Sequence, residues 1–284
     1  MSLRLWQRFN AHAITLPALF IFTLFLLCVI LGEHLSPFSP FDTVSDQQLL
    51  PPSWFQQGQL THLFGTDELG RDLLSRIIYG ARFTIGWSAM VVLIALIAGF
   101  IIGALSAAIG GIVDIVIMRI MDVLLAIPSL LFAIILVSAL GAGLSNSLYA
   151  VTLALLPHFV RSTRRCLREE LTREYVAAAR LDGAGGLSLL TQTLLPNLAT
   201  PLIVQTTLAL STALLDITAI GFLGLGAQAP LPEWGALLYS AHDLIQVAPW
   251  TVIVPGGAIF LAVLSVNLIG DALRNALDPR GQHH

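Results

Sequence analysis

Long stretches of this chain carry no charged side chain; none occurs between Arg82 and Asp114, for example. Crossing the hydrocarbon core of a bilayer takes about 20 mostly apolar residues, and backbone polar groups can face lipid only when they are hydrogen-bonded within the protein. We therefore expect the apolar runs to be helices. Six runs are candidates, near residues 13–32, 84–107, 119–140, 147–161, 200–222 and 250–270. The expected fold class is all-α, a polytopic membrane protein with about six transmembrane helices.

The composition agrees with a chain that lies in a bilayer. Of the 284 residues, 56% are hydrophobic and 11% are charged, whereas an ordinary soluble domain has about 25% charged residues. The net charge of −3 is too small to indicate a nucleic-acid partner. Cys28 and Cys166 show no metal or redox spacing, so we interpret both as structural.

The arginines predict the orientation of the chain in the membrane. All 14 basic residues are arginine, and a cytoplasmic N-terminus leaves only Arg71, Arg76 and Arg82 on the outside. The cytoplasmic sides of membrane proteins carry an excess of basic residues. We therefore expect both termini, and the arginine-rich segment 161–180, to lie in the cytoplasm.

We expect the first 83 residues to comprise an uncleaved anchor helix, an external loop and an amphipathic external helix. Prolines among polar residues at 35–60 indicate the loop. In the segment that follows, Thr66 can cap a helix that has an apolar stripe. Its charged residues are spaced i,i+4, as Asp67–Arg71 and Asp72–Arg76. We favour a solvated face with internal pairs for these charges, although they could also contact a docking protein.

Several motifs of catalysis and binding are absent from the sequence. It contains no phosphate-binding loop, so we expect no nucleotide to bind to this chain. The histidines are scattered, without the spacing of a metal site, and no nucleophile motif appears. We therefore expect no catalytic residues, no metal and no enzyme activity.

One polar stretch, residues 174–197, interrupts the apolar runs on the predicted cytoplasmic side. Residues 169–182 are compatible with a helix, and small side chains on it would let another surface approach closely. The residues that would share one side of this helix are Tyr175, Ala178, Ala179 and Asp182.

After this helix the sequence predicts an elbow. Gly183 permits a left-handed turn, residues 187–194 favour a second short helix, and we expect Pro196 to stop that helix before the fifth span. A helix–glycine–helix elbow suits insertion into a groove on a partner, where a rigid helix can transmit movement into the membrane. A plain connector between two spans explains the same residues equally well.

The elbow resembles the cytoplasmic coupling loop of ABC-importer permeases, whose pattern is Glu-Ala-Ala, three residues, Gly, nine residues, Ile, one residue and Leu-Pro. At unchanged spacing this chain has Ala177-Ala178-Ala179, Gly183, Thr193 and Leu195-Pro196. Two identities differ, Ala177 at the Glu and Thr193 at the Ile of the pattern.

Further segments, from about residue 50 to residue 280, resemble the dipeptide and oligopeptide permeases, in the second of their two permease subunits. These segments are FGTDELGRDLLSRIIYGAR, DVLLAIPSLLFAI, LPHFVRSTRR, GFLGLGAQAPLPEWG and NLIGDALRNALDPR. LLPPSW and VAPWTVIVPG are most similar to Sap-type members.

The resemblance implies a type I ABC-importer permease fold, with a five-helix core at 84–280 and a coupling loop at about 166–199. It also implies a second homologous permease, two cytoplasmic ATPases and a periplasmic solute-binding protein, in a bacterial inner membrane. This chain would form half of the pore and bind no cofactor, because ATP and Mg belong to the ATPases. The coupling residues would be Glu174, Tyr175, Ala177, Ala178, Ala179, Asp182, Gly183, Leu195 and Pro196.

The transported substrate is expected to be a dipeptide, an oligopeptide or an antimicrobial peptide. The same machinery in related permeases serves heme, nickel or putrescine, and these remain alternatives. A more distant alternative is an ion-coupled secondary transporter, which would need coupling-ion sites near the bilayer midplane.

Two further places in the sequence are candidate sites. Asp216 lies inside the fifth apolar run, where an acidic side chain is costly and usually faces a pore, water or a partner. It could line the translocation path, or it could lock helix packing through Ser211, Thr212 or the partner subunit. Glu233 and Trp234, in an external loop, could form a gate or docking surface, or equally an amphipathic anchor.

Overall fold

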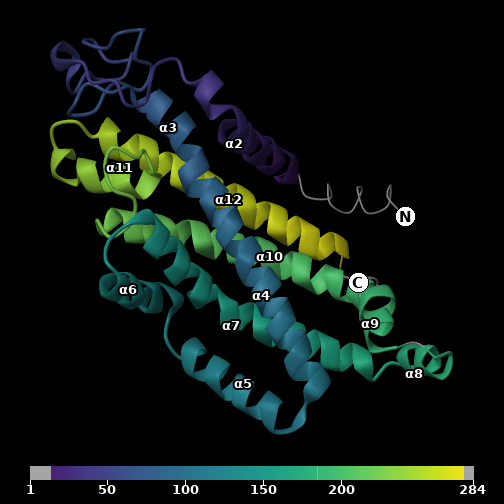
Figure 1. Cartoon of the computed structure of the whole chain (residues 1–284). Coiled ribbons are helices and arrows are strands. Elements are labelled where there is room, and N and C mark those ends of the chain that lie inside the picture. Colours follow the sequence, from purple (N-terminus) through teal and green to yellow (C-terminus); the bar gives the residue numbers. More distant parts are fainter. Residues whose placement is uncertain (1–13, 184, 278–284) are drawn as a thin grey trace.

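The computed structural model describes residues 14–183 and 185–277, and Figure 1 shows a bundle of helices joined by loops. No strand occurs in these two ranges, apart from an isolated bridge between Thr66 and Asp72. The terminal arginines that entered the topology prediction, Arg4, Arg8 and Arg280, lie outside the described residues.

Four continuous helical runs are long and apolar enough to cross a membrane, at or near four of the predicted spans. The first is α2 (Thr15–Leu35). The second joins α3 (Leu73–Ala81) to α4 (Trp87–Ile109) through a π-helical segment, η2 (Arg82–Gly86). The third ends with α10 (Leu195–Phe222), and the fourth is α12 (Trp250–Leu277).

The predicted span at 119–140 is wrong as a single helix. The chain instead forms α5 (Gly111–Leu125) and α6 (Ser129–Leu140), which meet at an angle of 90°. Pro128 explains the break, because proline lacks an N–H donor and disfavours helical geometry in the residue before it. Together the two helices can make a fifth, broken span.

The most extensive contact between two helices of the described residues joins α4 and α7 (Leu144–Leu171), which cross at the centre of Figure 1. Two glycines of α4 allow this approach: a Cβ on Gly99 would collide with Phe159, and one on Gly103 would collide with Val160. Small residues at helix interfaces let backbones pack closely in membranes. The run predicted at 147–161 is thus part of a longer helix that continues into the arginine-rich segment, and this helix is not among those that qualify as spans by length and hydropathy.

The loops that the sequence predicts to be external form a compact module, here named the external module, against the ends of α2, α3, α11 (Trp234–Ala241) and α12 (Figure 1). Two short 3-10 helices, η1 (Ser45–Gln47) and η4 (His242–Leu244), belong to this end of the molecule. The helix expected to start at Thr66 starts at Leu73 instead. Asp72 is its N-cap and accepts hydrogen bonds from the backbone N–H and the hydroxyl of Ser75.

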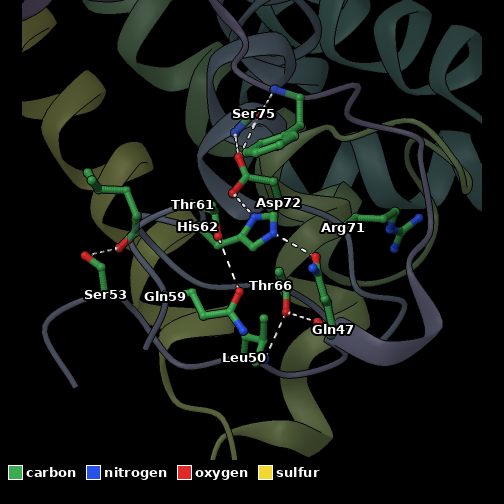
Figure 2. A network of polar contacts seen from close by, with 12 residues as sticks. Gln47, Leu50, Ser53, Gln59, Thr61, His62, Thr66, Arg71, Asp72 and Ser75 are labelled. Carbon is green, nitrogen blue, oxygen red and sulfur yellow. Dashed lines mark hydrogen bonds and ion pairs between the residues drawn. The ribbon is translucent and has the colours of Figure 1, made fainter. Parts of the chain in front are cut away.

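A polar network, rather than an apolar core, holds this module together (Figure 2). His62 contacts Asp72 through Nδ1 at 3.0 Å and Gln47 through Nε2 at 2.9 Å. The hydroxyl of Thr66 donates to the carbonyl of Gln47 and accepts from the backbone N–H of Leu50. These bonds tie segments far apart in sequence to the cap of α3.

The predicted solvated face of charges is wrong, since Asp67, Arg71, Asp72 and Arg76 are all buried. The Asp67–Arg71 pair is confirmed, with 2.7 Å between Nε and Oδ2. Arg76 contacts Asp67 rather than Asp72, because Asp72 caps the helix and binds His62. Burying charges requires such pairing, which the i,i+4 spacing alone did not specify.

Candidate functional site

The predicted elbow lies at the end of the molecule opposite the external module (Figure 1). Its first arm is α8 (Glu174–Leu181), which follows α7 after two non-helical residues, Thr172 and Arg173. Glu174 in the first turn and Arg180 in the last turn are both favourable for the helix dipole. The helix expected over residues 169–182 is therefore interrupted at Thr172 and Arg173, and the elbow begins with the shorter helix α8.

Gly183 makes the turn after α8, with φ +83°. Its N–H donates to the carbonyl of Arg180 at 3.1 Å, which closes the end of the helix. Residues with a Cβ rarely adopt this left-handed conformation. A Cβ at this position would meet no heavy atom within 4 Å. The requirement for glycine is thus conformational rather than steric, in agreement with the predicted left-handed turn.

The two faces of α8 differ in what they contact. Val176 is fully buried against Leu167, Leu189 and Leu194, and Ala179 packs beside it. Tyr175, Ala177, Ala178 and Asp182 are exposed, and so is Leu181, at 89%. The predicted common side of Tyr175, Ala178, Ala179 and Asp182 therefore holds except at Ala179, which faces the membrane-embedded helices. The elbow presents small residues outward and anchors itself by two inward residues.

Tyr175 links α8 to both flanking helices. Its hydroxyl donates to the carboxylate of Glu170 on α7 and accepts from Nδ2 of Asn197 on α10 at 3.1 Å. Asn197 also donates to the carbonyl of Thr193 at 3.0 Å. Partial burial, and then the nearby Glu170 carboxylate, raise the pKa of Tyr175, so the hydroxyl remains a donor. The sequence singled out Tyr175 but not these partners, which become neighbours only when the elbow folds.

The second arm differs from the prediction. After α9 (Gly186–Ser188) a π-helical segment, η3 (Leu189–Leu194), leads directly into α10, so Pro196 does not stop the helix. Residues 189–222 form one continuous helical run. A π-helical segment shifts the hydrogen-bond register, and such segments can accommodate a proline that an α-helical ladder would exclude. Leu195 and Pro196 are exposed at the start of α10.

Asp216 is buried within α10, with a relative exposure of 5%. Ser129, at the start of α6, lies near its carboxylate, and Oδ2 has no hydrogen-bond partner among the described residues. The partners expected within its own helix, Ser211 and Thr212, do not fill this role; Thr212 bonds to the carbonyl of Leu208. The contact with Ser129 favours a packing role between α10 and the broken helix pair.

Glu233 and Trp234 are both completely buried, so the interpretation as an exposed docking surface or anchor is wrong. Glu233 caps α11 by accepting from the N–H groups of Gly235 and Ala236 at 2.9 and 2.8 Å, and Thr84 donates to it at 3.1 Å. The indole of Trp234 donates to the carbonyl of Ile77. Burial raises the pKa of Glu233 to about 6. Both residues join α11 to the second helical run.

A charged cluster that the sequence did not predict joins the start of α5 to α7. Asp114, buried at the start of α5, contacts Arg164 and Arg168 of α7 and accepts from the hydroxyl of Ser106 at 2.6 Å. The signal was available, because Asp114 is the first charge after a long uncharged run. Its partners on α7 could not be chosen among several arginines without the fold.

The described residues contain no group of three or more His, Cys, Asp or Glu side chains that could hold a metal ion. The elbow, with its exposed small residues and its links to α7 and α10, is suited to mechanical contact with another protein. Through Tyr175, such contact would act on both α7 and α10.

Comparison with known proteins assigns the chain to a family. The family described as "Binding-protein-dependent transport system inner membrane component" matches residues 95–282. The family described as "N-terminal TM domain of oligopeptide transport permease C" matches residues 3–52.

Curated relatives match over almost the whole chain. The di/tripeptide transport system permease protein DppC of Pseudomonas aeruginosa (strain UCBPP-PA14) is 47% identical, over 97% of this chain and 91% of that protein. The peptide transport system permease protein SapC of Escherichia coli O6:H1 is also 47% identical, over 96% of this chain and 92% of that protein. The dipeptide transport system permease protein DppC of Escherichia coli K12 is 43% identical, over 97% of this chain and 92% of that protein.

Among solved structures, the chain is similar to one of inward-facing conformations of the MetNI methionine ABC transporter. The TM-score is 0.58 at 18% identity, and the match covers 72% of this chain and 97% of that one. At this identity the likeness shows the fold, which is that of a type I ABC-importer permease.

Proposed function

Since this chain belongs to the family of binding-protein-dependent transport system inner membrane components, and is thus a permease subunit of an ABC transporter, we propose that it moves short peptides across a bacterial inner membrane. The observation that carries the peptide assignment is the 47% identity to peptide permeases along nearly the full chain. We place both termini in the cytoplasm, as the distribution of arginines indicates.

The proposed transporter contains a second homologous permease, two ATPase subunits in the cytoplasm and a periplasmic solute-binding protein. This chain supplies half of the pore and does not hydrolyse ATP. ATP and Mg bind to the ATPases, and this chain holds no cofactor.

The elbow transmits movement between the ATPases and the pore. The exposed face of α8, with Ala177, Ala178 and Asp182, enters a groove on an ATPase subunit. Val176 carries the displacement into the apolar cluster below it. Tyr175 carries it to α7 and α10 through Glu170 and Asn197. ATP binding shifts the pore between its inward-open and outward-open states by favouring one of them through differential contacts.

The test is reconstitution of the assembled transporter in proteoliposomes with its ATPases and binding protein. We expect labelled di- and tripeptides to accumulate only when ATP reaches the ATPase side. Accumulation on an ion gradient without ATP would refute the ABC mechanism. ATP-dependent uptake of heme, nickel or putrescine, in place of peptides, would refute the peptide assignment alone.

A further inference from the structure

A hollow of about 420 Å³ opens on the surface between α7, α10 and the end of α5. Its volume is large enough for the end of a small ligand. The residues that line it are Leu125, His158, Arg161, Ser162, Arg165 and Gln205.

The basic residues of the hollow share one face of α7. His158, Arg161 and Arg165 are spaced i, i+3 and i+7, so their side chains lie one above another. All three are exposed. Arg161 contacts Asp122 of α5, but this pair is half exposed, at 51% and 47%, and one carboxylate leaves other guanidinium N–H groups available. The face therefore carries net positive charge.

Two polar side chains extend this face away from the arginines. His158 follows the buried Pro157 in the apolar half of α7, and Gln205 lies within the apolar run of α10. Both line the hollow, His158 with an exposed side chain and Gln205 with a half-buried one. A cytoplasmic excess of arginine would explain Arg165 but not His158 and Gln205, which lie in apolar stretches of their helices. Charged and polar residues in spanning segments face water or protein rather than lipid.

From this arrangement we propose that the hollow is an anion site on the cytoplasmic side of the translocation path, which binds the C-terminal carboxylate of the transported peptide. The proposal rests on the peptide function above. A short peptide at neutral pH carries a carboxylate, which is costly to move along an apolar route without a cationic partner. Arg165 supplies a planar fork of donors that matches a carboxylate, while His158 and Gln205 can add single hydrogen bonds.

The experiment uses the assembled transporter in nanodiscs of zwitterionic lipid, without binding protein, so that added peptide reaches only the membrane subunits. The probes are dialanine and dialanine amide, which differ in the carboxylate. We expect dialanine to inhibit basal ATP hydrolysis at a concentration about ten-fold lower than the amide, since a charge-assisted hydrogen bond gives a difference of this order. Arg165→Gln should abolish the difference. Arg119→Gln, which removes an exposed arginine of α5 outside the hollow, should retain it.

Three results would overturn the proposal. The first is equal inhibition by dialanine and its amide in the unsubstituted transporter. The second is an unchanged preference in Arg165→Gln. The third is a defect of Arg165→Gln that appears only when phosphatidylglycerol is added and is independent of peptide, which would assign the hollow to lipid headgroups. ATP-dependent peptide uptake by the unsubstituted transporter, measured in parallel, separates failure of this site from failure of the peptide function.

Discussion

Replacing Gly183 tests whether the elbow transmits movement or only connects two helices. The residue has φ +83°, and a Cβ would meet nothing within 4 Å, so a substitution acts on the backbone conformation alone. Holding valine in this region costs roughly 1–3 kcal/mol. A cost of about 2 kcal/mol lowers the equilibrium constant for the observed turn, relative to alternative turns, by roughly thirty-fold. We expect Gly183→Val to loosen α8 from its anchor at Val176, and Gly183→Ala to show a milder form of the same defect.

The assay measures ATP hydrolysis and peptide uptake together in proteoliposomes, after assembly of the complex has been checked. Insertion and pairing with the second permease should survive, because the spanning helices are unchanged. Peptide transported per ATP hydrolysed should fall sharply in Gly183→Val.

The chain supplies matched controls for this experiment. Gly185 lies two residues away with φ −70° and equally open surroundings, so Gly185→Ala should be neutral. Gly183→Asn should largely restore coupling, because asparagine tolerates the left-handed region better than other residues with a Cβ. Normal uptake per ATP in Gly183→Val would refute the coupling mechanism and leave the elbow as a plain connector.

Three further predictions follow from the burial of acidic residues and from the orientation. The raised pKa of Glu233 means that the folded protein favours its protonated form, so stability relative to Glu233→Gln should increase by up to about 2 kcal/mol as the pH falls from 6 to 4.5. Thermal unfolding of the unsubstituted protein and of Glu233→Gln across this pH range measures the difference. An equal dependence of stability on pH in both proteins would contradict the raised pKa of Glu233. Asp216→Asn, which keeps the shape and a polar end, should preserve assembly and uptake, whereas Asp216→Leu, which places no polar atom near Ser129, should impair assembly. Loss of uptake in assembled Asp216→Asn would instead show that the charge acts in the pore. A cysteine at Gln57 should react with an impermeant thiol reagent added outside intact cells, and one at Thr172 should be protected; the reverse pattern would invert the topology.

Apolar runs in the sequence were enough to locate four continuous spans of the chain. Lipid offers no hydrogen-bond partners to the backbone, so a sufficiently long apolar run satisfies its N–H and C=O groups by forming a helix. Helix formation of this kind does not depend on tertiary contacts. The same holds for Gly183, because a left-handed turn is a property of one residue and its immediate neighbours. The elbow could therefore be predicted from local sequence, without knowledge of its place in the fold.

The pairing of polar groups could not be predicted from the sequence, because many partners fit the same spacing. Asp72 was free to pair with Arg76, but the folded chain brings His62 and the N–H of Ser75 to it instead. Likewise, the sequence places Glu233 in an external loop, but in the folded chain it is buried and accepts a hydrogen bond from Thr84, which is distant in sequence. The basic hollow also depends on the fold, since α7, which precedes the elbow in the sequence, and α10, which follows it, both contribute residues to it. Pairing energies depend on which groups meet after burial, and burial is a property of the whole fold.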